Sequence, residues 1–273
     1  MISFGLFTIV KVVVSIAAVV GLSLIAEWVG PRFAGIVAGY PLGAAISLFF
    51  IGAEISPAFA AHSAIFASAG LAATIAFVSG YLLGLHWGEG RPLPAALALA
   101  ILTALAGFGI AACAISILPI NWVSAPLIAL TTIVVAGRGF RAIPEAVIEE
   151  KIRLSVPVAF FRAAFAAIII VGVTFAARIV GPRWAGLLSA FPITMMPLLI
   201  IIHAGYQPAH VRAIIRNVPR GMGSLLIYTL TVAVTYPPLG IAWGTIIGYL
   251  AATVYLVLLE RGNLRMRSRI MRR

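Results

Sequence analysis

Two basic residues fall inside long apolar stretches of the sequence, where charged side chains are rare. Lys11 lies in the first stretch and Arg162 lies in the sixth, 151 residues later. A charge placed in hydrocarbon costs about 3 kcal/mol or more, so it normally has water, a partner or a ligand beside it. The two residues therefore predict a binding site for an anion. Snorkelling to the membrane surface, or a structural bond to a backbone carbonyl, is the alternative for both side chains.

A short phrase that could complete this site occurs twice. "GPRFAGIVAGYP" begins at Gly30 and "GPRWAGLLSAFP" begins at Gly181, again 151 residues apart. The proline that ends each phrase removes a backbone donor and clashes with the preceding turn, which predicts a helix break. Backbone groups freed at such breaks hold ions in membrane transporters, although a packing kink is the alternative. The predicted substrate-binding residues at the two breaks are Tyr40, Pro41, Gly43, Ser189, Pro192 and Thr194.

The acidic residues narrow the class of substrate. The chain has no aspartate, and all of its glutamates fall at predicted helix ends or in loops. A pathway for a cation or a proton normally uses a carboxylate embedded in the membrane. None is predicted here, which favours an anionic substrate. The four histidines lack metal-ligand spacing and no nucleophile motif is present, so we expect neither a metal, a cofactor nor an enzymatic activity.

These residues must be positioned by membrane helices. Apolar residues make up 63% of the chain, charged residues 10%, and the mean hydropathy is +1.14. Crossing about 30 Å of hydrocarbon takes about 20 helical residues, and the apolar runs are too long and too uniform for a β-barrel. The sequence therefore predicts an all-α polytopic membrane protein with about nine spans, at 4–28, 33–53, 62–85, 93–118, 120–136, 155–177, 184–203, 218–236 and 238–259.

Basic residues predict the orientation of the chain. With nine spans, 15 Lys and Arg residues collect on one side and only Arg178 and Arg183 on the other. Because such residues accumulate in cytoplasmic loops, we expect the N-terminus outside and the basic C-terminus in the cytoplasm, against anionic phospholipids. The net charge of +12 is then a signal of orientation, not of nucleic-acid binding. If the run 120–136 only dips into the membrane, the count becomes 13 against 4 and the N-terminus lies inside.

The repeated phrase predicts an internal duplication. Five predicted spans separate the two copies, and an odd number turns the second copy upside down. The basic stripe of Arg212, Arg216 and Arg220 agrees with this, because its counterparts in the first copy are Ala61, Ile65 and Ala69. Inverted repeats are common in secondary transporters, although duplication could also enlarge a structural bundle. The predicted units are a first repeat at 1–136, a cytoplasmic linker at 137–154, a second repeat at 155–259 and a basic tail at 260–273.

One stretch of the second half resembles a known family. "WAGLLSAFPITMMPLLIIIHAGYQPAHVRAIIRNVPRGMGSLLIYTLTVAV" is similar to the GlpM family of small bacterial inner-membrane proteins in its A-G-L…F-P core and in the basic segment after it. The similarity covers most of 155–259 and is fainter in "FAGIVAGYPLGAAISLFF", where Tyr40 replaces the Phe. It implies a location in the bacterial inner membrane and carries no catalytic residue. The chain departs from the family as a fused double copy with an extra span.

Together these features predict a secondary transporter or exporter of a small anion, working by alternating access between two inverted repeats. The substrate-binding groups would be Lys11, Arg162 and the residues at the two breaks. A membrane scaffold or accessory subunit, with the two cations bound to lipid or a partner helix, is the alternative. A flippase, which would move lipid headgroups across the membrane, is a further alternative.

Overall fold

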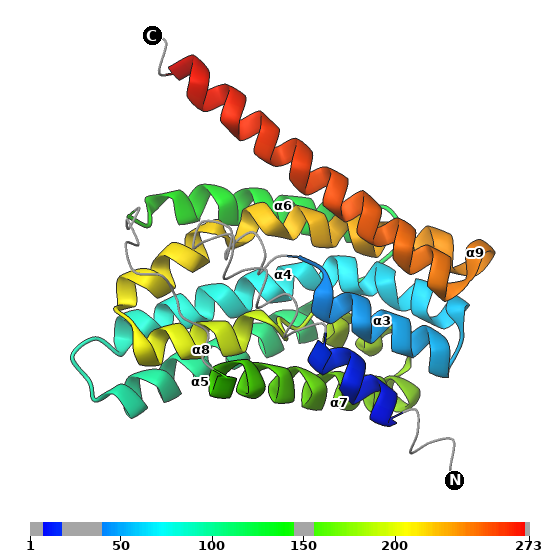
Figure 1. Ribbon diagram of the computed structural model, residues 1–273, viewed down its shortest axis with the longest axis horizontal. Helices are drawn as coiled ribbons and strands as arrows, with labels where there is room; N and C mark the ends of the chain where they lie inside the picture. The colour runs from blue at the N-terminus through cyan, green and yellow to red at the C-terminus, as the bar shows by residue number, and fades with distance from the viewer. Residues whose placement is uncertain (1–7, 18–39, 145–155, 271–273) are drawn as a thin grey trace.

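The computed structural model describes residues 8–17, 40–144 and 156–270. These residues form helices and turns, with no β-strand among them, which confirms the predicted all-α fold (Figure 1). The helices in chain order are an N-terminal helix (Thr8–Ala17), α3 (Leu42–Glu54), α4 (Pro57–Trp87), α5 (Leu93–Ser116), α6 (Ser124–Gly139), the short 3-10 helix η1 (Phe140–Ala142), α7 (Val156–Ser189), α8 (Met195–Gly205) and α9 (Pro208–Ile270).

Five of the described helices are long and apolar enough to cross a membrane, which supports a membrane-embedded protein. They are Pro57–Trp87, Leu93–Ser116, Ser124–Ala142, Ala163–Ser189 and Pro208–Leu259. The predicted run 120–136 thus belongs to a helix of spanning length. The count of nine continuous spans is not confirmed, because α3 has 13 residues and α8 has 11. At about 1.5 Å per residue, α3 reaches about two-thirds of the way across the hydrocarbon and α8 little more than half.

Two long helices change direction at a glycine. Gly181 in α7 and Gly240 in α9 both have φ 76°, a backbone conformation that side chains with a Cβ atom rarely adopt. At Gly240, which follows Pro237 and Pro238, α9 doubles back on itself (Figure 1). The predicted boundary between the last two spans is therefore a hairpin. The first arm of that hairpin begins at Pro208, earlier than the predicted position 218.

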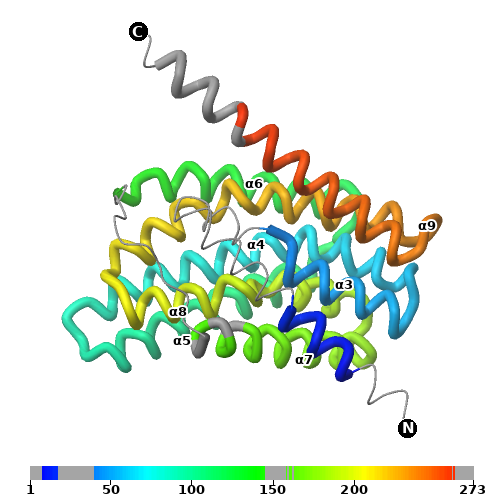
Figure 2. The backbone as a smooth tube through the Cα atoms, in the orientation of Figure 1, coloured from blue at the N-terminus to red at the C-terminus, as the bar shows by residue number. Residues whose placement is uncertain are grey.

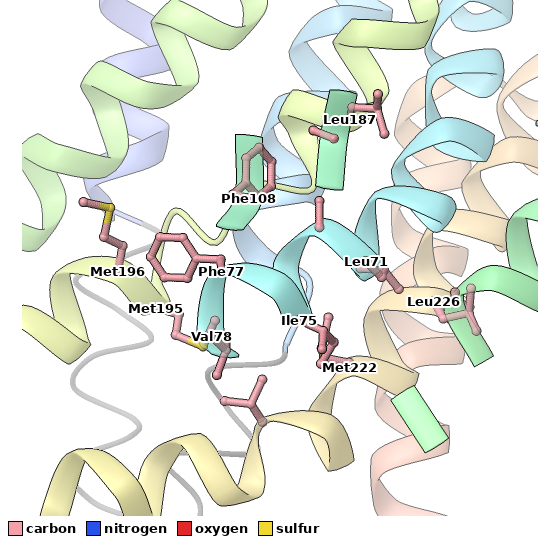
Figure 3. Close-up of a cluster of buried hydrophobic side chains, with 14 of the residues drawn as sticks. Leu71, Ile75, Phe77, Val78, Phe108, Leu187, Met195, Met196, Met222 and Leu226 are labelled. Carbon is pink, nitrogen blue, oxygen red and sulfur yellow. The ribbon is translucent and has the colours of Figure 1, made fainter. Parts of the chain in front are cut away.

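Helix α4 lies at the centre of the bundle and packs against α3, α5, α6, α7 and α9. Small residues allow the closest approach: a Cβ atom on Gly84 would lie 2.5 Å from the Cα atom of Ala100 in α5. Figure 3 shows the side chains that fill the core beside α4. They come from four other helices and include Phe108 of α5, Leu187 of α7, Met195 of α8 and Met222 of α9.

The second arm of α9 packs against the first arm up to Ala252, and its C-terminal part projects away from the other helices (Figures 1 and 2). Trp243, Leu250 and Leu258 are exposed along it, as expected for a surface that faces lipid. The predicted tail 260–273 is helical up to Ile270. In the predicted linker, η1 occupies Phe140–Ala142, and residues 145–155 lie outside the described part of the chain.

Candidate functional site

The glycines of the second repeated phrase have two structural roles. Gly181 provides the turn within α7 described above. Gly186, one turn further on, faces α4 so closely that a Cβ atom on it would overlap the carbonyl oxygen of Ser63. A larger residue at 186 would therefore push α7 away from α4. The phrase thus brings the end of α7, at Ser189, against the centre of the bundle.

The end of this phrase is a helix break. Between Ser189 and the start of α8, the Ile193 N–H donates to the Phe191 carbonyl at 2.7 Å, a bond that skips one residue as in a γ-turn. The Met196 N–H then donates to the Pro192 carbonyl at 2.9 Å and begins the new helix. The predicted span 184–203 is therefore interrupted at Pro192, as the proline indicated.

The first phrase ends in a turn with the same hydrogen bonds. The Leu42 N–H donates to the Tyr40 carbonyl at 2.8 Å, and the Ala45 N–H donates to the Pro41 carbonyl at 2.8 Å. Each bond lies 151 residues before its counterpart in the second phrase. The Pro41 carbonyl therefore accepts a hydrogen bond from the first turn of α3, as the Pro192 carbonyl does from the first turn of α8. The rest of the first phrase, up to residue 39, lies outside the described residues.

The two turns meet at one small cavity. Its volume is about 30 Å³, enough for one or two water molecules, and Thr74 of α4 also lines it. A Cβ atom on Gly43 would lie 3.1 Å from the Cβ atom of Ile193, so the two breaks are in contact. All six break residues predicted from the sequence line this cavity, namely Tyr40, Pro41, Gly43, Ser189, Pro192 and Thr194.

The helices α3 and α8 leave this cavity in opposite directions along α4. The cavity lies beside the middle of α4, where a Cβ atom on Gly70 would lie 2.8 Å from the Cβ atom of Ala190. From there α3 runs to the first residue of α4, Pro57. The last turn of α8 instead contacts Tyr81, near the other end of α4. Both helices thus point their N-termini at the cavity and their C-termini away from it.

The electrostatics of the cavity follow from these helix ends. The first N–H groups of a helix lack acceptors within the helix and carry a partial positive charge. At α3 and α8 the N-cap residues, Pro41 and Thr194, provide no side-chain cap, and Gly43 and Thr194 line the cavity. The first two N–H groups of α8 donate to the Pro192 carbonyl and its third residue is a proline, so α8 contributes the partial charge of its dipole and not free N–H groups. Just after α7, the Ala190 carbonyl accepts from the Thr74 hydroxyl at 2.6 Å. The cavity therefore favours a negatively charged or strongly hydrogen-bond-accepting group.

The hydroxyl groups at the cavity are not equivalent. The Ser189 hydroxyl donates to the Ala185 carbonyl at 2.7 Å, and the Tyr40 hydroxyl lies 3.0 Å from the Thr253 hydroxyl on α9. Their hydrogen-bonding capacity is thus partly used within the protein. Thr194 is buried just before the first residue of α8 and lines the cavity. Among the predicted residues, it is the best-placed side-chain donor for a bound anion.

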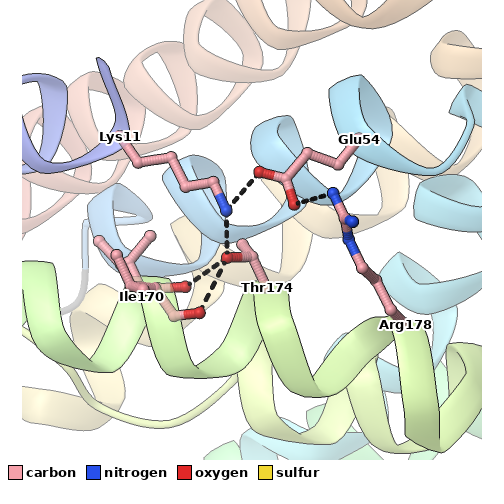
Figure 4. A network of polar contacts seen from close by, with 6 residues as sticks. Lys11, Glu54, Ile170, Thr174 and Arg178 are labelled. Carbon is pink, nitrogen blue, oxygen red and sulfur yellow. Dashed lines mark hydrogen bonds and ion pairs between the residues drawn. The ribbon is translucent and has the colours of Figure 1, made fainter. Parts of the chain in front are cut away.

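Lys11 lies apart from this cavity, in a buried charged cluster (Figure 4). Its Nζ donates to the Thr174 Oγ1 at 2.8 Å and forms an ion pair with Glu54, whose other oxygen is 3.1 Å from an Arg178 nitrogen. The Glu54 side chain is 6% exposed. Glu54 ends a helix, as predicted, and its side chain is buried within the protein because the turn after α3 folds this end against α7. The cluster lines a separate, mostly apolar groove of about 700 Å³.

The other predicted cation, Arg162, lies within α7, and its side chain is outside the described part of the structure. The predicted meeting of Lys11 and Arg162 at one anion site thus stays a prediction. The basic stripe of α9 makes contacts within the protein instead of projecting freely toward lipid. Arg212 forms an ion pair with Glu89. Arg216 donates to the Ile143 carbonyl at 2.6 Å, and Arg220 donates to the Asn217 side chain at 3.0 Å.

A buried histidine that sequence reasoning did not select lies at the far end of α8. The His203 Nδ1 is 3.2 Å from the Tyr81 hydroxyl, and the two rings meet edge to face. His203 also lines a polar pocket of about 630 Å³, together with Glu89, Arg91 and Gln207. The only signal in the sequence is an imidazole within an apolar run. Its partner is 122 residues away, so only the fold reveals the pair.

Within the described residues, no three His, Cys, Asp or Glu side chains are grouped to hold a metal ion. No family model, curated protein or solved structure matches the chain. The resemblance to the GlpM family therefore stays a prediction from the quoted residues. The two helix breaks and the cavity between them are the structural features that bear on function.

Proposed function

We propose that this protein is a secondary transporter or exporter of a small anion, and that the anion binds where α3 and α8 begin. The observation that carries this proposal is the convergence of two uncapped helix N-termini on one buried cavity. Partial positive charges at helix N-termini, together with a buried hydroxyl, favour an anion without requiring a formal charge in the membrane. In secondary transporters, half-helices interrupted near the bilayer midplane serve this purpose.

The predicted inverted repeat is supported by hydrogen bonds that recur at one spacing. Besides the two proline turns, the Ile55 N–H donates to the Ile51 carbonyl at the end of α3, and the Tyr206 N–H donates to the Ile202 carbonyl at the end of α8. These two bonds are again 151 residues apart. The opposite directions of α3 and α8 along α4 support the inversion. We propose that the halves at 1–136 and 155–259 move against each other around the cavity.

The two ends of the proposed pathway differ in this conformation. At the end of α3, the cluster of Lys11, Glu54 and Arg178 joins the N-terminal helix, α3 and α7. The groove beside this cluster is mostly apolar, whereas the pocket beside His203 at the end of α8 is lined by polar side chains that water can reach. We propose that the charged cluster holds the α3 side closed while the α8 side is open. Lys11 would then act in closing the pathway and not in binding the substrate at the breaks.

The proposed location follows from the distribution of basic residues and from the resemblance. We place the protein in the bacterial inner membrane with its N-terminus outside and its C-terminus in the cytoplasm. The ion pair between Glu89 and Arg212 lies at the α8 end, which this orientation puts on the cytoplasmic side. The basic tail after Leu259 would lie against anionic phospholipids, because each cationic side chain contributes about 1 kcal/mol at such a surface.

The test is a flux measurement with purified protein in liposomes, using acetate, phosphate and methanesulfonate as probes. Wild-type protein should carry at least one of them. Gly43→Val should abolish the flux, because the added side chain meets Ile193 and fills the cavity. Gly109→Val is the matched control, since a Cβ atom at Gly109 meets nothing within 4 Å. A wild-type protein that is folded and carries none of the three probes would favour the scaffold or flippase function instead.

A further inference from the structure

His203 is a buried histidine at the C-terminal end of α8. Its side chain is 6% exposed, lies in the last turn of an apolar helix and lines the polar pocket at the open end of the proposed pathway. Histidine is the side chain whose ordinary charge change falls near neutral pH. A buried histidine with one hydrogen-bonded partner and access to a pocket is suited to binding and releasing a proton.

The groups around His203 determine how it can hold a proton. The C-terminal end of α8 carries a partial negative charge, and the His203 side chain is buried beside it. Helix α5, which packs against α8, contains no Asp, Glu, Lys, Arg or His. Of the charged side chains described on α7, Arg178 and Arg183 lie toward the opposite end of the bundle, beside Glu54 and the Ser116 carbonyl. Within the described residues, the other titratable and charged groups at this end are Tyr81 and His86 on α4, Glu89 and Arg91 before α5, and Tyr206, His210 and Arg212 at the start of α9.

One short helix connects the histidine to the proposed anion site. Helix α8 has 11 residues, with Thr194 just before its first residue and His203 in its last turn. At about 1.5 Å per residue, the two ends are about 17 Å apart. A helix of this length moves as one body when the repeats rearrange. A proton at its C-terminal end and an anion at its N-terminal end would therefore travel with the same element.

We propose that His203 is the proton-binding site of a proton-coupled anion symport. This inference rests on the proposed transport function and adds the coupling ion. In the neutral form the Nδ1–H of His203 donates to the Tyr81 hydroxyl, which leaves the lone pair of Nε2 to take a proton from pocket water, and the anion binds at Thr194. The loaded carrier then moves no net charge, which removes the electrical cost of carrying an anion alone. When the pathway opens on the other side, the anion and the proton leave and His203 returns to its neutral form.

The proposal makes proton binding and anion binding mutually dependent. If a proton on His203 strengthens anion binding by some factor, a bound anion strengthens proton binding by the same factor. Transport should therefore rise as the pH falls, because a larger fraction of the imidazole then carries the second proton. The sequence argued against a proton pathway because it showed no embedded carboxylate. An imidazole can carry the proton without one.

The test follows proton and anion movement separately in the same liposomes. Radiolabelled methanesulfonate is the best probe, because it stays ionised and does not carry protons across the bilayer by itself; phosphate is the second probe. A pH-sensitive dye inside the liposomes reports proton movement. Wild-type protein should acidify the interior as the labelled anion enters. His203→Gln should lose the anion-driven proton movement, and its anion flux should lose most of its pH dependence.

Two further variants make the outcome specific. Tyr81→Phe removes only the hydroxyl that contacts His203, and it should shift the pH midpoint of transport even if His203→Gln folds poorly. His62→Gln is the control, because His62 is an exposed histidine near the start of α4, at the opposite end of the protein from His203, and should behave like wild type. An unchanged pH midpoint in Tyr81→Phe would overturn the proposal. Wild-type anion flux without proton movement would overturn the coupling and leave transport standing, whereas no anion flux in wild type would overturn both.

Discussion

Gly43 and Ile193 are in contact at the centre of the bundle, although 150 positions separate them: a Cβ atom on Gly43 would lie 3.1 Å from that of Ile193. Gly43 belongs to the first turn of α3, and Ile193 follows the proline that begins α8. Their contact brings two short helices together at their N-terminal ends, beside the small cavity. The contact therefore links the repeated phrase in the sequence to the proposed site.

A side chain at position 43 should block transport. Because Gly43→Val places two methyl groups where Ile193 and the cavity lie, we expect anion flux to fall roughly tenfold or more, equal to about 1.4 kcal/mol of lost binding. The measurement is flux into liposomes at matched protein content. Gly109→Val should retain wild-type flux. Equal flux in both variants would exclude this cavity as the substrate site.

The hydroxyl of Thr194 should contribute more to anion binding than that of Ser189. Thr194→Val keeps the shape of the side chain and removes a donor to a charged group, which costs about 1.5–3 kcal/mol. We therefore expect roughly a tenfold to hundredfold rise in the substrate concentration for half-maximal flux. Ser189→Ala should have a smaller effect, because that hydroxyl already donates to the Ala185 carbonyl. A larger loss in Ser189→Ala would reverse the assignment of the two hydroxyls.

Removal of Lys11 should destabilise the protein. Lys11→Ala leaves Glu54 buried with one of its two cationic partners missing, and breaking a buried ion pair costs about 3–5 kcal/mol. Thermal unfolding in detergent should show a marked loss of stability. The double variant Lys11→Met with Glu54→Gln removes both charges and should recover part of that loss. If Lys11→Ala instead retains full stability and loses only flux, Lys11 binds substrate as the sequence first indicated.

The turn in α9 should depend on Gly240. Its φ of 76° combined with a ψ of 171° is a conformation that is nearly restricted to glycine. Gly240→Ala should therefore lower the free energy of unfolding by about 1–3 kcal/mol. Gly109→Ala, on a regular helix with open space around it, should raise stability slightly because alanine has the higher helix propensity. A neutral effect at Gly240 would mean that the hairpin tolerates another turn geometry.

Close packing of α7 on α4 should depend on Gly186. Gly186→Ala places a methyl group against the Ser63 carbonyl, which belongs to the backbone and cannot move aside alone. We expect a destabilisation of about 1–3 kcal/mol, as for an overpacked core. Gly172→Ala is a control on the same helix, because a Cβ atom there meets nothing within 4 Å. Similar unfolding temperatures for the two variants would contradict the proposed packing of the phrase.

The apolar composition and the lengths of the runs were sufficient to predict a helical membrane protein and to locate α4, α5 and α6 closely. Hydrophobicity is enough to locate such spans, because a long helix pairs its backbone N–H and C=O groups within itself and needs no partner in the membrane. The sequence could not show that α3 and α8 are too short to span. Their runs are continuous in hydropathy, and the interruption depends on backbone hydrogen bonds around Pro41 and Pro192.

The sequence by itself determined the residues of the two breaks, because proline and glycine limit the backbone locally wherever they occur. Only the tertiary structure decided which distant residues meet. It paired Lys11 with Glu54, placed both apart from the breaks, and set His203 beside Tyr81. Such pairs join residues between 43 and 122 positions apart, and no local pattern encodes which helix faces another. Those contacts depend on how the whole bundle packs. The proposed separation of the anion site at the breaks from the Lys11 cluster and from His203 depends on the same packing.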